Sequence, residues 1–598
     1  MWRKIAIAIF PVIALADSTP VILISVDTLR ADHLSCYGYK KIRTPHLDAL
    51  TKGGTLFGAI DSPVPMTLPA HTSLLTSEYP FVHGIEENGQ PVKPGAVTLA
   101  GVLKSHGYRT AAFIGGYVLD ASFGLNQGFD LYDSPFRTHI QPGEDSPDLR
   151  RPAETVLRGA TNWLSTHTDR PFFVFIHLYD VHQPYSRGYD AQVSYVDEQL
   201  GRFLLFLSAK GLTNKTLIVL TSDHGESLGE HGENTHGYFI YQSTLWTPLL
   251  IHWPAGMGTH AARVDEPASL IDIAPTILQS LAIPAPAQFQ GRSLLKPGEE
   301  AVYGESMYAR DHLGCSPLRS LRVGSYKYIQ APKPELYDLV KDPAELRNLY
   351  DQEKALARSL QERLKSVHNP KRQRGETSAS PEVVARLRSL GYLAGSRRAS
   401  NQDSGPDPKD RLDEYMRYSQ AIMYSSTGHL PEAIREFQEV LKQDPQNVLA
   451  HFYLAVCYHR SRRLDEATKE LDATLAIAPD YWRAEELLGT IWLEKKDYVR
   501  ARDQFTHILK VVPTDYGAHY NLGILATRDG KWDEAQRQLR AAVDADPHSA
   551  PAHYRLGIVL LQQGKEREAG QEFRQALAAD PEFADARKAL ENLPGGRQ

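Results

Sequence analysis

The last third of the 598-residue chain repeats itself with a period of 34 residues. Proline, a small residue and a large apolar residue each keep this spacing through five units. The positions are Pro445, Pro479, Pro513, Pro547 and Pro581, then Ala433, Ala467, Ala501, Ala535 and Ala569, and then Phe437, Leu471, Phe505, Leu539 and Phe573. Small residues where helices cross and proline at the turn predict one helical hairpin per unit. Residues 411–598 are therefore predicted to stack into an all-α superhelix with a concave groove.

This period resembles the tetratricopeptide family. The resemblance covers five repeats, and we expect a capping helix near residues 583–590. It implies that the groove binds a protein or a peptide, but it does not identify that partner.

Upstream of the repeats, apolar segments of strand length alternate with amphipathic helical segments. Four of the apolar segments are continuous, which is typical of strands buried on both faces of a parallel sheet. They cover residues 21–26, 171–180, 216–222 and 247–254. Strands that alternate with helices predict an α/β domain over residues 20–300.

Beyond residue 300 the pattern changes. Residues 320–329 and 335–343 have the alternation of an antiparallel hairpin, and a helical segment follows them. We therefore expect a small α+β subdomain at residues 301–393. The polar residues 394–410 show no apolar periodicity and are predicted to be a linker to the repeats.

Reactive side chains follow the predicted strands. Asp27 comes directly after the first strand, and Asp223 and His224 come after the third. The carboxyl ends of parallel strands share one edge of the sheet, where open α/β sheets bind their ligands. Thr67 precedes a first turn that contains proline, so it lies near a helix start, where free backbone N–H groups favour negative charge. It is interpreted either as a nucleophile or as an ordinary N-cap.

Together these side chains offer ligands for one divalent metal ion. The ligand set is Asp27, Thr67, Asp223 and His224. Two carboxylates, an imidazole and a hydroxyl suit Ca, Zn, Mn or Mg, and the ion would make the hydroxyl more acidic. Each residue also has a structural interpretation, since Asp27 could cap a helix and Asp223 with His224 could form a turn.

Residues 20–395 resemble the sulfatase-like branch of the alkaline phosphatase superfamily. The segments that carry the resemblance occur in the family's order and include VILISVDTLRADHLSCYG, TLPAHTSLLTSEYP, HLYDVHQPY, TSDHGESLGEHG and TPLLIHWP. It implies an alkaline-phosphatase-like α/β/α sandwich, with metal bound by Asp27, Asp223 and His224 and attack by Thr67. It also implies that three histidines contact or protonate the ester: His71, His182 and His236. From the residues alone, His182 and His236 could equally be surface histidines.

The chain departs from true sulfatases at the nucleophile. The family's Cys-x-Pro-x-Arg core, whose Cys or Ser becomes formylglycine, is replaced by Thr67, Pro69 and His71. A threonine cannot form formylglycine, so none is expected. Thr28 stands where the family has a second acid, and GGYVLD lacks the family's sulfate-binding Lys and His.

A threonine nucleophile, SDHGESLGE and the pair His236–Gly237 are more similar to the phosphoethanolamine and lipoteichoic-acid transferases of the same superfamily. Those enzymes use a metal-bound threonine on phosphodiesters. Sulfate and phosphate esters, and hydrolysis and transfer, therefore remain alternatives. The expected substrate is an anionic ester of a glycan, a lipid or a small molecule.

Two other classes of function are weighed against this enzyme. The α/β domain could be an inactive ligand-binding module beside the repeats, or the repeats could make the chain mainly a scaffold. Retention of all four predicted ligand residues favours an enzyme.

Composition and the N-terminal residues indicate which partners and which cellular location to expect. The chain is 42% hydrophobic and 23% charged with a formal charge of −6, which predicts no nucleic-acid partner. Its three cysteines are too few and too scattered for a disulfide framework. Residues 1–16 have the basic, apolar and small-x-small order of a cleavable secretory signal, so we expect export. The apolar run is too short to span a bilayer, and no other run in the sequence reaches that length.

Overall fold

The computed structural model describes residues 19–136, 150–183, 185, 187–296, 298, 301–368, 404–479, 481–547 and 549–593. The expected signal peptide and the end of the expected α+β subdomain lie outside these ranges. No helix in the described ranges is both long and apolar enough to cross a membrane. The chain divides into two compact units, and the main part of the second unit begins at Asp413.

A mixed sheet organises the first unit, and it contains nine strands within the described ranges. Its central strand β1 (Val21–Val26) pairs in parallel with β5 (Phe172–Leu178) and with β6 (Leu217–Thr221). The other strands are β2 (Gly54–Asp61), β3 (Arg109–Phe113), β4 (Leu131–Asp133), β7 (Trp246–His252), β8 (Arg263–Val264) and β9 (Ala268–Ser269). The prediction of an α/β domain is confirmed, although β7 runs antiparallel between β6 and β2.

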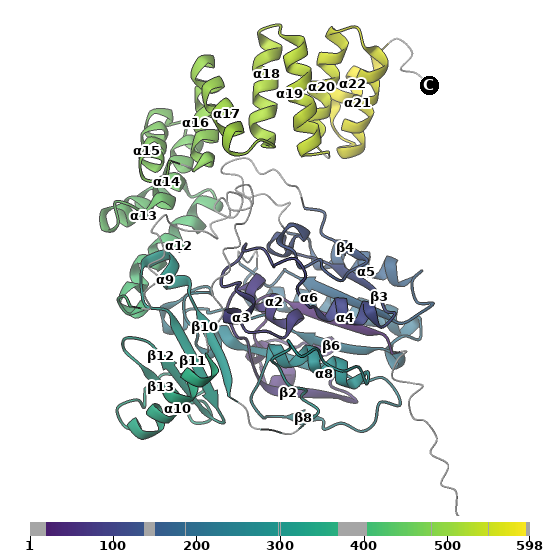
Figure 1. Cartoon of the computed structure of the whole chain (residues 1–598), viewed down its shortest axis with the longest axis vertical. Coiled ribbons are helices and arrows are strands. Elements are labelled where there is room, and N and C mark those ends of the chain that lie inside the picture. The colour runs from purple at the N-terminus through teal and green to yellow at the C-terminus, as the bar shows by residue number, and fades with distance from the viewer. Residues whose placement is uncertain are drawn as a thin grey trace, which may run out of the picture. The chain divides into compact units, whose positions relative to one another are not determined.

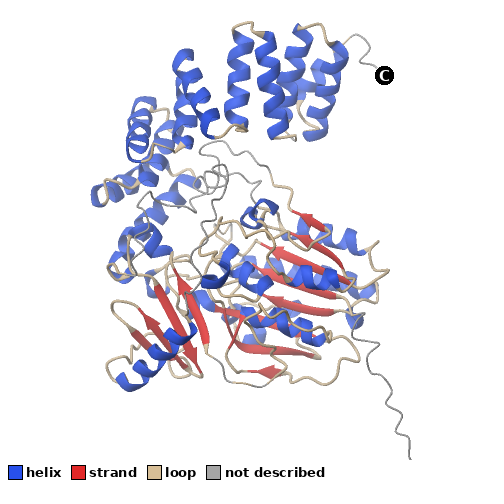
Figure 2. Cartoon of the chain, in the orientation of Figure 1, coloured by secondary structure: helices blue, strands red, loops and turns tan. Residues whose placement is uncertain are grey.

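Helices cover both faces of this sheet (Figures 1 and 2). Helices α1 (Pro45–Leu50), α5 (Ala153–Leu164) and α6 (Tyr189–Ala209) pack on one face. Helices α2 (Thr67–Thr76), α4 (Leu99–Ser105) and α8 (Ile273–Ser280) pack on the other, and α3 (Pro80–His83) and α7 (Gln242–Leu245) are short. Ile22, Ile24 and Val26 alternate along β1 into the α5–α6 side, and each buried side chain of this size contributes about 1.5–3 kcal/mol.

A second, antiparallel sheet follows in the same unit. Its strands are β10 (Val302–Ser306), β11 (Leu318–Val323), β12 (Tyr326–Gln330) and β13 (Glu335–Asp338), and α9 (Tyr308–Leu313) lies between β10 and β11. Helix α10 (Lys354–Val367) packs on this sheet through Ala357, Leu360 and Leu364, which lie on one helix face. This is the α+β arrangement that the sequence predicts after residue 300.

Residues 404–412, which we call the strap, are attached to the first unit. Their polarity and lack of apolar periodicity predict a linker for most of them. Gly405 donates its N–H to Ser316 Oγ at 3.0 Å, and the Ser316 N–H donates to the Pro406 carbonyl at 2.9 Å. Backbone groups satisfied by such partners anchor a mainly polar segment, so composition did not reveal this contact.

The strap also touches the loop of residues 229–241, which carries His236. Tyr238, which is fully buried, donates its hydroxyl to the Pro408 carbonyl at 2.7 Å. A Cβ atom on Gly232 would stand only 2.8 Å from Leu412 Cδ2, so this leucine lies directly against the loop. The strap therefore contacts the loop of residues 229–241 at two points.

The second unit is a series of helical hairpins, as the period predicts. Its helices are α12 (Leu412–Ser426), α13 (Leu430–Gln443), α14 (Val448–Arg460), α15 (Leu464–Ile477), α16 (Trp482–Glu494), α17 (Tyr498–Val511), α18 (Tyr516–Arg528), α19 (Trp532–Ala545), α20 (Ala550–Gln562), α21 (Glu566–Ala579) and α22 (Ala584–Glu591). The periodic alanines and the periodic Phe and Leu positions are fully buried between neighbouring helices.

One side-chain pair recurs between the helices of a repeat. In the last full repeat, His553 Nδ1 lies 2.6 Å from Glu572, while His553 Nε2 lies 3.0 Å from the Pro547 carbonyl. His451 makes the same two contacts with Glu470 and Pro445. In a third repeat, His519 bonds to Gln538, so the partner of the histidine is uncharged there.

Candidate functional site

The residues that the sequence places at strand ends meet at one edge of the sheet. Asp27 follows β1, and Asp223 and His224 follow β6, so the pairing of β1 with β6 brings them together. One ligand atom from each of the three lies within 4.8 Å of the others. All three side chains are fully buried.

Thr67 completes this group from α2. The helix begins at Thr67 itself, and its N-cap, Met66, makes no side-chain capping bond. Thr67 Oγ1 lies 3.4 Å from His224 Nε2. The hydroxyl is therefore directed at the acidic cluster and does not serve the helix as a cap.

The cluster has the properties of a divalent-metal site. Asp27 Oδ1 and Asp223 Oδ2 are buried without a hydrogen-bond partner, which is costly for a carboxylate unless a cation lies beside it. Burial raises the pKa of Asp27 to about 7, although nearby His224 opposes this shift. Two carboxylates, one imidazole and a hydroxyl are a donor set that divalent ions accept, so these residues fit the expected ion.

His177 is a neighbour of this cluster that the sequence analysis missed. It lies within β5, where it interrupts an apolar run, and it is fully buried. Its Nε2 atom stands 3.2 Å from Asp27 Oδ2. Partners of this kind orient the carboxylates and imidazoles that bind metals. A polar residue inside a fully apolar strand was the available signal.

His71 lies on the inner side of α2, against Asp223 of the cluster. It is fully buried, with Nδ1 at 2.7 Å from the Thr67 carbonyl and 3.6 Å from Asp223 Oδ2, and with Nε2 at 2.9 Å from Ser25 Oγ. Burial lowers its pKa to about 3. The residue lies one helical turn after Thr67, and this spacing turns it toward β1. His71 therefore supports the start of α2 and lies beside Asp223, and its contact with the ester stays a prediction.

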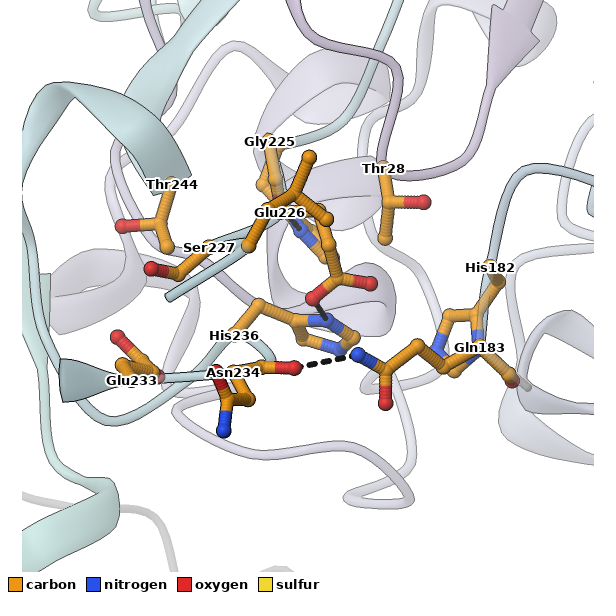
Figure 3. Close-up of polar contacts among 12 residues, drawn as sticks. Thr28, His182, Gln183, Gly225, Glu226, Ser227, Glu233, Asn234, His236 and Thr244 are labelled. Carbon is orange, nitrogen blue, oxygen red and sulfur yellow. Dashed lines mark hydrogen bonds and ion pairs between the residues drawn. The ribbon is translucent and has the colours of Figure 1, made fainter. Parts of the chain in front are cut away.

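His182 and His236 lie next to each other (Figure 3), and His236 also lies against His224 of the cluster. The ring centroids of His236 and His224 are 4.5 Å apart, and those of His236 and His182 are 5.0 Å apart. His236 Nδ1 stands 3.0 Å from a Glu226 oxygen, whereas His182 Nδ1 donates to the Gln183 carbonyl at 2.7 Å. The structure thus brings together two of the three histidines that the resemblance implied.

Asn88 is a second residue that the sequence analysis did not single out. Its side chain is buried, and Oδ1 accepts the N–H of Leu68 at 2.8 Å, in the first turn of α2. This bond fixes the amide, so the NH₂ group carries two donors on the side away from Leu68. Asn88 lies in a loop, EENGQP, without a recognisable pattern.

Thr28 has a strained backbone next to Asp27. Its φ of 56° is in the left-handed region, which is rare for a β-branched residue. In this conformation the Thr28 N–H donates to Asp223 Oδ1 at 3.2 Å, and its carbonyl accepts the Tyr189 hydroxyl at 2.7 Å. The hydrogen bond from Thr28 holds Asp223 in place. Backbone strain that persists next to such a contact is typical of functional sites.

Comparison with family models divides the chain in the same way. Residues 19–283 match the model described as Sulfatase, and residues 229–370 match the C-terminal model of N-sulphoglucosamine sulphohydrolase. Residues 426–488 and 520–584 match two tetratricopeptide repeat models.

Curated relatives are similar over parts of the first unit. The chain is 25% identical to the ulvan-active sulfatase of Formosa agariphila over 392 residues, which are 55% of this chain and 76% of that protein. It is 33% identical to bovine arylsulfatase K over 197 residues, which are 30% of this chain and 36% of that protein. Among solved structures, Ps i-CgsB has a similar fold, with a TM-score of 0.51, 19% identity and coverage of 60% of this chain and 94% of that one.

The fold and the cluster at its sheet edge define an α/β/α protein of the ester-hydrolase class. More specifically, the chain joins sulfatase-family domains at residues 19–370 to tetratricopeptide repeats at residues 426–584.

Proposed function

We propose that the first unit is a metal-dependent enzyme that cleaves sulfate or phosphate esters with Thr67 as its nucleophile. One observation carries this proposal: the Thr67 hydroxyl is directed at Asp27, Asp223 and His224 and is not used as a helix cap. The orphaned carboxylate oxygens of Asp27 and Asp223 support metal binding by the same group.

The residues allow a two-step reaction. When bound, the metal ion supplies positive charge that acidifies the Thr67 hydroxyl and offsets the charge of the ester. Thr67 first loses its hydroxyl proton to solvent. Its Oγ1 then attacks the phosphorus or sulfur atom, the bond to the leaving oxygen breaks, and protonated His182 or His236 gives that oxygen a proton. Water or an acceptor hydroxyl then attacks the same atom and gives its proton to the histidine, while the bond to Thr67 Oγ1 breaks and returns the alkoxide for the next cycle.

Phosphate esters fit this nucleophile better than sulfate esters do. Water can attack the phosphorus of a phosphorylated threonine, whereas a sulfated threonine lacks the hydrate of formylglycine that eliminates sulfate. The NH₂ group of Asn88, held beside the first turn of α2, is a suitable donor to a non-bridging oxygen of the ester. We therefore place phosphate mono- and diesters before sulfate esters.

The test is turnover of a panel of chromogenic esters. Purified protein would be stripped with a chelator, reloaded separately with Zn, Mn, Ca or Mg, and assayed on p-nitrophenyl sulfate, p-nitrophenyl phosphate and bis(p-nitrophenyl) phosphate. We expect turnover that requires metal and is fastest on a phosphate ester. Full metal occupancy without turnover of any ester would instead favour the inactive ligand-binding module.

The setting of this enzyme is also part of the proposal. The order of charge and apolarity in residues 1–16 supports export, and the tetratricopeptide repeats support a peptide or protein partner. Cell fractionation tests the first point, since export predicts a mature N-terminus near residue 17 outside the cytoplasm.

A further inference from the structure

Glu226 is a buried carboxylate that the proposed reaction does not yet use. Its side chain is fully shielded from solvent, and it lies in the loop that follows β6. Oε1 stands 3.0 Å from His236 Nδ1, and Oε2 accepts the Tyr185 hydroxyl at 2.8 Å. Both oxygens therefore have a defined partner, one of which is a histidine beside the metal cluster (Figure 3).

The surroundings of Glu226 hold it in one place. Arg30, itself almost fully buried, donates from Nη1 to the Glu226 carbonyl at 3.0 Å and to Glu230 at 2.7 Å. Burial and the adjacent Glu226 raise the pKa of Tyr185 far above its usual range, so its phenol remains a donor. A side chain fixed from both ends is a suitable support for a catalytic imidazole.

The two histidines near the cluster differ in their partners. His182 Nδ1 faces the neutral carbonyl of Gln183, and Arg150 lies close by. His236 Nδ1 faces the carboxylate of Glu226. A carboxylate accepts a hydrogen bond and cannot donate one, so it fixes the hydrogen of His236 on Nδ1. Nε2 is then the ring nitrogen that can exchange a proton with the ester.

We propose that Glu226 is a positioning residue that sets the tautomer and orientation of His236, and thereby makes His236 the partner of the leaving group. This inference rests on the proposed function. Before this step both ring nitrogens of His236 carry a proton. As the bond from phosphorus or sulfur to the leaving oxygen breaks, Nε2 gives that oxygen its proton and the ring keeps the hydrogen on Nδ1. In the second step Nε2 takes a proton from the attacking water, which restores the doubly protonated ring, so His236 gains or loses no proton over the cycle.

The test is the dependence of the rate on the leaving group. In Glu226→Gln a neutral amide replaces the carboxylate without changing the shape of the side chain, so Nδ1 loses its charged partner and one of the two acceptor oxygens becomes a donor. We expect kcat to fall by about 10–100-fold on an alkyl phosphate, whose leaving group needs the proton, and by less than about threefold on the p-nitrophenyl ester. KM and metal content should stay near the wild-type values.

Two further variants separate positioning from a structural role. Tyr185→Phe removes the other hydrogen bond but leaves the carboxylate in place, so we expect it to keep most of the activity. In a His236→Ala background, Glu226→Gln should cost little more, because Glu226 acts through His236. Equal losses on both leaving groups, or a full further loss in the His236→Ala background, would overturn the inference. A wild-type protein that turns over no ester would instead reject the proposed function itself.

Discussion

Replacing the Thr67 hydroxyl should abolish turnover while leaving the protein folded. In Thr67→Val a methyl group replaces Oγ1 in a side chain that is 1% exposed, and the shape is kept. The variant loses a hydrogen bond worth about 0.5–1.5 kcal/mol and gains apolar burial worth about 0.8 kcal/mol. Because no cap is lost, stability should change by less than about 1 kcal/mol.

The kinetic effect should be much larger than this. Loss of a covalent nucleophile commonly costs four or more orders of magnitude in rate, which corresponds to at least about 5.4 kcal/mol. Thr67→Ser keeps the attacking oxygen and loses one methyl group, so it should stay within about 100-fold of the wild type. The two substitutions differ mainly in the presence of one oxygen atom.

The assay combines three measurements on the same preparations. These are kcat on the best ester of the panel, the midpoint of thermal unfolding, and metal content by elemental analysis. A slow substrate should also leave a phosphorylated or sulfated Thr67 peptide that mass spectrometry can detect in the wild type. If Thr67→Val bound metal and kept more than about one tenth of the wild-type kcat, a metal-activated water would be the better candidate for the attacking group.

The remaining predictions concern the metal, the repeats and the strap. Asp223→Asn should lower metal occupancy and turnover together, and full occupancy by elemental analysis would contradict the ligand assignment. Burial lowers the pKa of His553, but its bonds to Glu572 and a carbonyl outweigh this and raise the pKa above 6.5. The pair therefore stabilises the array fully below pH 6.5, and this stabilisation is lost as the pH rises through the folded-state pKa of His553. We expect Glu572→Gln to speed hydrogen exchange in α20–α21 relative to the wild type, and the increase should be larger at pH 6 than at pH 9. Gly405→Ala would place Cβ at 2.4 Å from a backbone oxygen, so we expect it to detach the strap. Trypsin should then cleave faster within residues 404–412, and substitution of the exposed Ser404 by Ala is the control.

Much of the fold could be predicted because its signals are local and repeated. Continuous apolar runs identified the central strands, and the 34-residue period identified the array. The convergence of Asp27, Asp223 and His224 also followed, since residues directly after neighbouring parallel strands must lie at one edge. Each of these inferences needs only the position of a residue within its own element.

The parts that could not be predicted depend on which way a side chain points and on contacts between distant segments. His71 lies one helical turn after Thr67, and the sequence did not show that this turn directs its ring inward, to the Thr67 carbonyl and Asp223. His177 and Asn88 act on the cluster from a strand interior and from a loop, where no spacing relates them to it. The strap is held by backbone hydrogen bonds, and these leave no trace in composition.

The strap has a mechanical consequence. The strap ends at Leu412, which lies against Gly232, so the chain leaves the first unit beside the loop that carries His236. A pull on the chain from the C-terminal side would load the contacts of the strap in order, beginning with Leu412 and the ion pair of Asp410 with Lys333 and then reaching the Tyr238 bond to the Pro408 carbonyl. An anchor placed there would transmit the load to the loop of His236, whereas an anchor on the far side of the sheet would leave that loop unloaded.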